Sequence, residues 1–77
     1  QKEYIRLYLE QGQQEGLVRA NLNVEVTATL FAKIHNDAVR DVEQIEAHGL
    51  NMHQLGNTAM DIFVRGVLSE EGRKLYQ

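Results

Sequence analysis

The chain lacks cysteine, proline and tryptophan among its 77 residues. Without cysteine it forms no disulfide and offers no thiolate to a metal or a substrate. The same absence fits a reducing compartment, and we expect a cytoplasmic protein. The lack of proline leaves nothing to break long helices from within.

Long apolar runs and a basic surplus are also missing. No stretch of 18 apolar residues occurs, so we predict no membrane partner. Eight Lys and Arg residues stand against eleven Asp and Glu, and the net charge is -3. A nucleic-acid-binding module normally carries a basic patch or stripe, whereas the basic residues here are dispersed. We therefore do not expect these residues themselves to bind DNA.

No catalytic or metal-binding motif is present. Ser69 is the only serine, and the six glycines are dispersed rather than gathered into a phosphate-binding loop. His48 and His53 flank a turn and form at most a weak adventitious metal pair, because no third ligand has a suitable spacing. We predict that the chain is not an enzyme and holds no cofactor and no metal ion.

Apolar residues recur at helical spacing along most of the chain. The pattern predicts a single all-α domain over residues 1–77, with helices at about 2–15, 24–48 and 52–68 and a short tail turn at 69–76. Gly16 and Gly49 are natural helix stops, and Asn23 and Asn51 are natural N-caps. Ser69 is placed to cap the tail turn.

The second and third predicted helices are joined by Gly49-Leu50-Asn51. With Gly49 at C′, Leu50 and Ile45 form the hydrophobic pair of a Schellman motif. A connection this short places the two helices side by side, so we predict an antiparallel helical hairpin.

Both hairpin helices have apolar faces too wide for one neighbour. On a helical wheel the arcs cover roughly 140° and 160°, against a little over 100° for an ordinary surface helix. Two hairpins packed face to face form a four-helix bundle about a twofold axis, so we predict a homodimer. Small residues such as Ala38, Ala59 and Gly66 allow close approach. The predicted dimer interface comprises Phe31, Ile34, His35, Ala38, Val42, Ile45, Leu55, Ala59, Ile62, Phe63 and Gly66.

The alternative is that an upstream part of the protein covers the surplus apolar surface. Helical pattern begins at Gln1 with no capping residue before it. We therefore expect the chain to start inside a helix of a longer protein.

Three stretches carry a resemblance to a known family. They are residues 12–23, Gly-Gln-Gln-Glu-Gly-Leu-Val-Arg-Ala-Asn-Leu-Asn; residues 28–31, Ala-Thr-Leu-Phe; and Ile62-Phe63-Val64-Arg65-Gly66-Val67-Leu68 followed by Glu71-Gly72-Arg73. Together they resemble the last helices of tetracycline-repressor (TetR) family transcriptional regulators, and the resemblance covers nearly the whole chain.

The resemblance implies the dimerisation and effector-response region of such a regulator. DNA would be bound only through an N-terminal helix-turn-helix that has no match here. The first helix would border the pocket of a small-molecule effector, with Tyr4, Tyr8 and His35 along that border. From the residues alone, His35 is either a ligand contact or a structural imidazole within the apolar face.

Two other functions remain open. The first is a stand-alone adaptor that binds an amphipathic helix in its groove. The second is a helical bundle with a small-molecule pocket between its first two helices.

Overall fold

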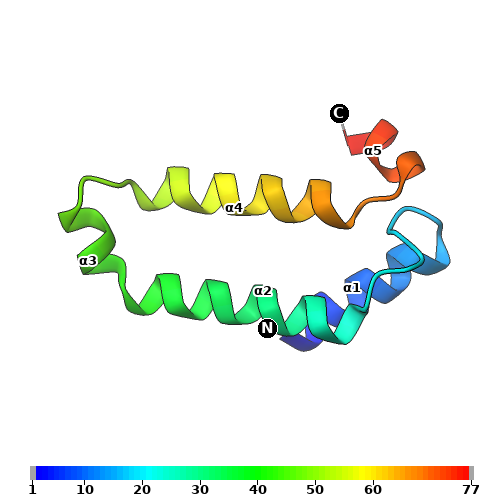
Figure 1. The fold of residues 1–77 in the computed structure, drawn as a ribbon, viewed down its shortest axis with the longest axis horizontal. Coiled ribbons are helices and arrows are strands. Elements are labelled where there is room, and N and C mark those ends of the chain that lie inside the picture. Colours follow the sequence, from blue (N-terminus) through cyan, green and yellow to red (C-terminus); the bar gives the residue numbers. More distant parts are fainter. Residues whose placement is uncertain (1, 77) are drawn as a thin grey trace.

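The computed structural model describes residues 2–76, which form five α-helices and, within that range, no β-strand. They are α1 (Lys2–Gln14), α2 (Val24–Arg40), α3 (Val42–Ala47), α4 (Met52–Val67) and α5 (Glu70–Tyr76). The all-α prediction is confirmed. α4 lies opposite α2 and runs in the reverse direction, while α1 packs along α2 (Figure 1).

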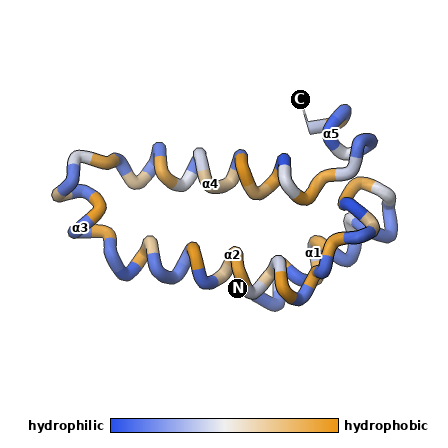
Figure 2. Tube along the Cα trace, in the orientation of Figure 1, coloured by the Kyte–Doolittle hydropathy of each residue, from blue (hydrophilic) through white to orange (hydrophobic). Residues whose placement is uncertain are grey.

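The molecule is thin for its length. Its principal extents are 41 × 26 × 15 Å. Since one helix with its side chains is about 10–12 Å across, the shortest extent leaves room for little more than one layer of helices. Hydrophobic residues recur along α2 and α4 (Figure 2). In residues 2–76 there is no second full layer of helices to cover them.

The predicted N-caps are present. The Asn23 side chain accepts a hydrogen bond from the backbone N–H of Val26 at 2.9 Å. The Asn51 side chain accepts from the N–H groups of His53 and Gln54 at 2.8 and 3.2 Å. These bonds satisfy amide groups that the first turn of a helix leaves without an intrahelical partner.

The predicted glycine stop at the hairpin turn is also present. Gly49 has φ +83°, its N–H donates to Glu46 O, and the Leu50 N–H donates to Ile45 O. This pair of bonds is a Schellman motif, and the positive φ explains why glycine occupies the position. The end of α1 repeats it, with Gly16 at φ +78° and the Leu17 N–H bonded to Gly12 O.

The prediction of one helix over residues 24–48 is wrong in detail. The helix ends at Arg40, and α3 begins at Val42. Asp41 lies between them at φ −102° and ψ 22°, outside helical geometry. Asp has a low helix propensity and favours helix boundaries, but the apolar spacing continues across it and conceals the break. The tail turn is likewise a defined helix, α5, so residues 2–76 form five helices rather than three and a turn.

The main buried cluster is small and lies at one end of the molecule, and Ala28 and Ala32 of α2 are buried apart from it. Leu9, Val18 and Val67 are buried together. They come from α1, from the segment after it, and from the last turn of α4. Ile5, Leu22, Val24 and Phe63 pack against them. No large side chain in residues 2–76 is fully buried, as is usual for a short chain, which buries a smaller fraction of its surface than a larger domain.

Backbone and side-chain bonds join the two segments at this end. Val18 and Leu68 form an isolated antiparallel bridge. The Arg19 N–H donates to Val67 O at 2.8 Å, and the Ser69 N–H donates to Leu17 O at 2.9 Å. We call residues 16–19 and 66–69, with these bonds, the junction.

Ser69 caps α5, as predicted, and also ties it to the junction. Its hydroxyl accepts from the Gly72 N–H at 3.0 Å and donates to Gly16 O at 2.6 Å. Gly72 is buried, and a Cβ there would collide with the carbonyl oxygen of Leu17. α5 is therefore seated against the segment that follows α1.

Gly12 is required for packing, although its place inside a helix suggests only a propensity cost. A Cβ at Gly12 would overlap the Val18 side chain, whereas one at Gly56 of α4 would meet open space. We expect Gly56→Ala to stabilise the chain by about 1 kcal/mol through helix propensity. Gly12→Ala should destabilise it, because overpacking costs about 1–3 kcal/mol and exceeds the same gain. Urea unfolding of both variants checks this, and equal stabilisation by both would contradict it.

Candidate self-association groove

An apolar groove runs between α2 and α4. Its larger cavity, of about 760 Å³, is lined from α2 by Phe31, Ile34 and His35 and from α4 by Leu55 and Met60, among others. A second cavity of about 370 Å³ continues toward the C-terminal end of α4, past Leu30, Ile62 and Gly66. Both are open to solvent within the single chain and are lined almost entirely by apolar atoms.

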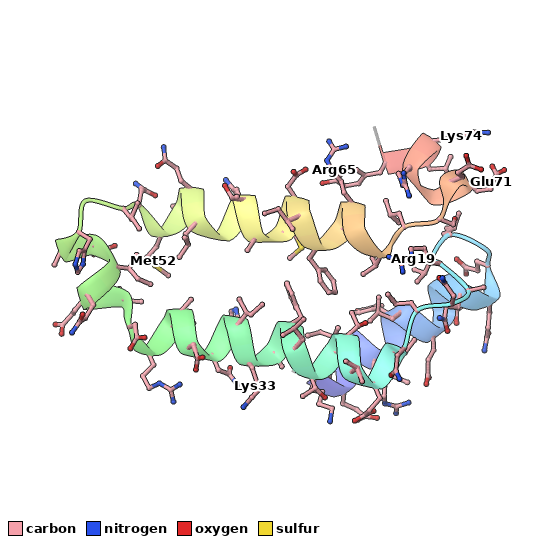
Figure 3. All side chains as sticks on the ribbon, viewed as in Figure 1. Arg19, Lys33, Met52, Arg65, Glu71 and Lys74 are labelled. Atoms are coloured by element: carbon pink, nitrogen blue, oxygen red, sulfur yellow. The ribbon has the colours of Figure 1, made fainter. Side chains whose placement is uncertain are left out.

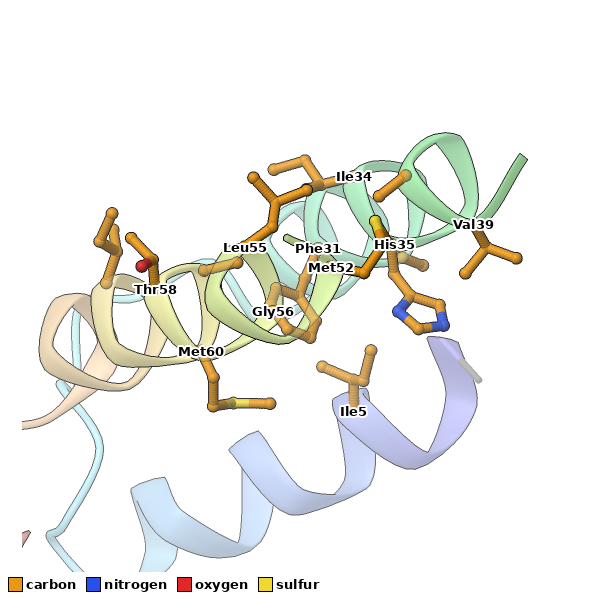
Figure 4. Close-up of a pocket in the computed structure, with 14 residues that line it drawn as sticks. Ile5, Phe31, Ile34, His35, Val39, Met52, Leu55, Gly56, Thr58 and Met60 are labelled. Carbon is orange, nitrogen blue, oxygen red and sulfur yellow. The ribbon is translucent and has the colours of Figure 1, made fainter. Parts of the chain in front are cut away.

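Two phenylalanines cross the groove. The rings of Phe31 and Phe63 are stacked with their centroids 3.9 Å apart. This stack links the middle of α2 to α4. Ile5, His35 and Met60 lie toward α1, whereas Ile34 lies on the side away from α1 (Figure 4). The hairpin therefore has one apolar side bordered by α1 and one that is uncovered.

The uncovered side is strongly exposed. Ile62 is 66% exposed, Leu30 59% and Ile34 49%. All three line the second cavity, so they form one continuous surface on α2 and α4. Isolated apolar side chains are normal on a protein surface, whereas large contiguous groups are typical of interaction sites.

Charged groups lie outside the groove. Lys33 points away from α4, and Arg65 points outward from α4 (Figure 3). Arg65 donates a hydrogen bond to the Asp61 carboxylate at 2.8 Å, and this bond raises the pKa of the guanidinium above its usual value. The Arg65 guanidinium also lies 5.3 Å from the centroid of the Tyr76 ring, a cation–π contact between α4 and α5. A partner in the groove would desolvate no charged side chain, because none lines either cavity.

The structure gathers most of the predicted interface residues into this groove. Phe31, Ile34, His35, Ala38, Leu55, Ala59, Ile62, Phe63 and Gly66 line one cavity or both. Val42 and Ile45 line neither; they are half-buried on α3, beyond the break at Asp41. That these residues contact a second chain stays a prediction.

Some groove residues were missed from sequence. Leu30 lies about 100° from Phe31 on the wheel, outside the single arc assigned to that helix. It lines the second cavity all the same. Met52 and Met60 also line the groove, and their places within the apolar arc of α4 were a usable signal.

The predicted ligand border divides into two parts. His35 lines the larger cavity, as does Ile5 of α1. Tyr4 and Tyr8 line neither cavity and are 68% and 74% exposed. Within this chain, Ile5 is the α1 side chain that faces the groove (Figure 4).

The histidines do not gather with other ligands. His48 Nδ1 lies 2.8 Å from Gln44 O, and no group of three metal-binding side chains occurs in the described part of the chain. We expect the double variant His48→Ala, His53→Ala to keep the helicity and assembly of the unmodified chain. Elemental analysis after purification checks the metal. A stoichiometric ion in the unmodified chain that is lost from the variant would reveal a site.

No family model, curated protein or solved structure matches this chain. Among residues 2–76, no helix is long and apolar enough to cross a membrane.

Proposed function

We propose that this chain is the dimerisation and effector-response region of a TetR-like transcriptional regulator. The supporting observation is the uncovered apolar groove between α2 and α4, the two helices that correspond, by resemblance, to the last two of that family. A second copy of the same hairpin supplies the apolar surface that the groove requires. The two hairpins then form a four-helix bundle about a twofold axis.

The shape of the groove supports an occupant made of helices. Ala59 and Gly66 both line its α4 wall, about two helical turns apart. Such small residues let a partner helix approach closely. Ile62, between them, projects an exposed branched side chain. Small and large positions alternating along a helix permit the interdigitation that bundles use.

The size of the core supports the need for a partner. The buried residues are few: one cluster lies at the junction end, and Ala28 and Ala32 are buried on α2, while the hairpin extends beyond them with exposed apolar side chains. In water this exposure is unfavourable by about 25 cal/mol per Å² of apolar surface. Pairing removes that surface from water and stabilises both chains.

In this proposal the bundle fixes the distance between two DNA-binding heads located upstream. An effector bound beside α1 favours one of two spacings and changes operator affinity by that preference. DNA contact belongs to the upstream heads.

A fusion experiment tests the proposal. The chain is joined to an unrelated DNA-binding head that occupies its operator tightly only as a dimer. We expect the fusion to repress a reporter strongly, and the fusion carrying Ile62→Glu to repress no better than the head alone. A fusion of the unmodified chain that matches the head alone would contradict the proposal.

The larger cavity favours a second candidate, a small-molecule-binding bundle. It has a volume of about 760 Å³, within the range of ligand pockets, and His35 and Thr58 are its polar side chains. An apolar fluorescent dye distinguishes the two candidate functions. Its binding is measured at a chain concentration at which only dimer is present. Stoichiometric binding favours a ligand site in the assembled groove, and no binding favours a groove filled by the partner.

A further inference from the structure

The junction links two segments that lie far apart in the sequence. The Arg19 guanidinium donates to Gly66 O at 2.8 Å, across 47 positions. The Ser69 hydroxyl donates to Gly16 O at 2.6 Å, across 53 positions. The two backbone bonds of the Val18–Leu68 bridge lie between them. Four hydrogen bonds thus join the same two short segments.

One side of the junction is tied firmly to α1. Gln13 donates through Nε2 to the carbonyl oxygens of Arg19 and Leu22, each at 3.0 Å. Val18 is buried against Leu9 in the core. α1 in turn makes the most extensive interhelical contact of the described chain, with α2. Residues 16–19 therefore move with α1 and α2 as one unit.

The other side of the junction is the C-terminal end of α4. The carbonyl oxygens of Gly66 and Val67 are among the last of that helix, which have no intrahelical partner. Arg19 donates to both, from its guanidinium to Gly66 O and from its backbone N–H to Val67 O. In Figure 3 Arg19 lies at this end of α4. Away from the junction, α4 is held to α2 by α3 at the far end and by the Phe31–Phe63 stack in the middle. The larger cavity lies on the α3 side of the stack, and the second cavity continues past the stack to Gly66 and Val67.

We infer that the junction is a strap that sets the spacing of α4 from α2, and that loosening it opens the groove. A shift of α1 is then delivered to α4 through Arg19 and Ser69. Any effect of the strap on dimer formation rests on the proposed function, in which α4 is the helix that meets the second copy. The spacing within one chain does not depend on that proposal.

Two variants loosen the strap by different routes. Gly72→Ala inserts a methyl group against Leu17 O, with the side chain of Leu68 also close, and must push α5 and the end of α4 away. Arg19→Gln removes the charged bond to Gly66 O but keeps the backbone bridge. Arg19 is an exposed residue, so this second variant spares the core. Gln54→Ala, at an exposed residue of α4 that lines neither cavity, is the control.

Because the chain has no cysteine, a spin-label pair can be introduced without other changes. The labels are attached at Lys33→Cys on α2 and Asn57→Cys on α4. Both native residues are exposed and line neither cavity. The labelled chain is diluted with an excess of unlabelled chain of the same variant, so that double electron–electron resonance reports only distances within one chain. Circular dichroism confirms that each sample is helical.

We expect Gly72→Ala and Arg19→Gln to shift the distance distribution to longer values and to broaden it, while Gln54→Ala leaves it unchanged. If Gly72→Ala does not fold, Arg19→Gln decides. A folded Arg19→Gln chain with the unmodified distribution would overturn the strap.

Sedimentation velocity on the same samples separates this inference from the proposed function. A longer distance in a chain that is always monomeric supports the strap and contradicts the dimer. An unchanged distance in a chain that is a dimer contradicts the strap and leaves the dimer standing.

Discussion

If two copies pair as proposed, Ile62→Glu should convert the dimer into a folded monomer at micromolar concentration. Ile62 is 66% exposed in the single chain, so the substitution removes no core contact within it. In a dimer the new carboxylate would be buried in an apolar interface, because no Lys or Arg side chain lines either cavity. At about 3 kcal/mol per subunit, the two copies together weaken the dimer about 10⁴-fold.

The control for Ile62→Glu is Asn57→Glu. Asn57 is an exposed residue of α4 that lines neither cavity. It is a cleaner control than Arg65, which bonds to Asp61 and contacts Tyr76. Sedimentation velocity over a concentration series should give a monomer for Ile62→Glu and the unmodified behaviour for Asn57→Glu. Equal affinity of both variants would mean that α4 does not carry the interface.

Val67→Asp should unfold the chain. Val67 is 7% exposed and packs with Leu9 and Val18 in the core. Its replacement removes about 1.5 kcal/mol of apolar burial and places a carboxylate in that core at a further cost of several kcal/mol. A domain of this size has a total stability of roughly 4–12 kcal/mol, so the loss takes most of it.

Val26→Asp is the matched control for Val67→Asp. Val26 is 60% exposed and lies in the first turn of α2, where a negative side chain interacts favourably with the helix dipole. Circular dichroism in increasing urea should show Val67→Asp unfolded before denaturant is added and Val26→Asp near the unmodified midpoint. A folded Val67→Asp chain with that same midpoint would show that stability does not centre on the junction.

Local signals in the sequence predicted local structure well. Asn23 and Asn51 cap their helices, Gly49 ends the helix before it, and Ser69 begins the last one. Each signal acts through bonds within a few residues, so a single sequence contains all that is needed. The apolar arcs also brought most of the groove residues together, because a helix fixes which residues share a face.

Features that depend on distant residues escaped prediction. Gly12 and Gly72 leave no room for a Cβ atom, because the Val18 side chain lies against Gly12 and Leu17 O lies against Gly72. Neither close approach has a local signature in the sequence. Arg19 resembles any exposed arginine until α4 brings Gly66 O within 2.8 Å. The break at Asp41 was hidden because Ala38, Val42 and Ile45 continue the helical spacing across it. Tertiary packing decided the roles of Gly12, Gly72 and Arg19, whereas the break at Asp41 follows the low helix propensity of Asp.

Isotope-filtered NMR on a mixed sample tests most directly whether two copies meet through the groove. Chain labelled with ¹³C is mixed with an equal amount of unlabelled chain, and contacts between labelled and unlabelled protons are recorded. We predict interchain contacts from the methyl groups of Leu30, Ile34 and Ile62. Interchain contacts confined to the exposed side chains of α1, such as Tyr4 and Tyr8, or no interchain contacts at all, would contradict the account.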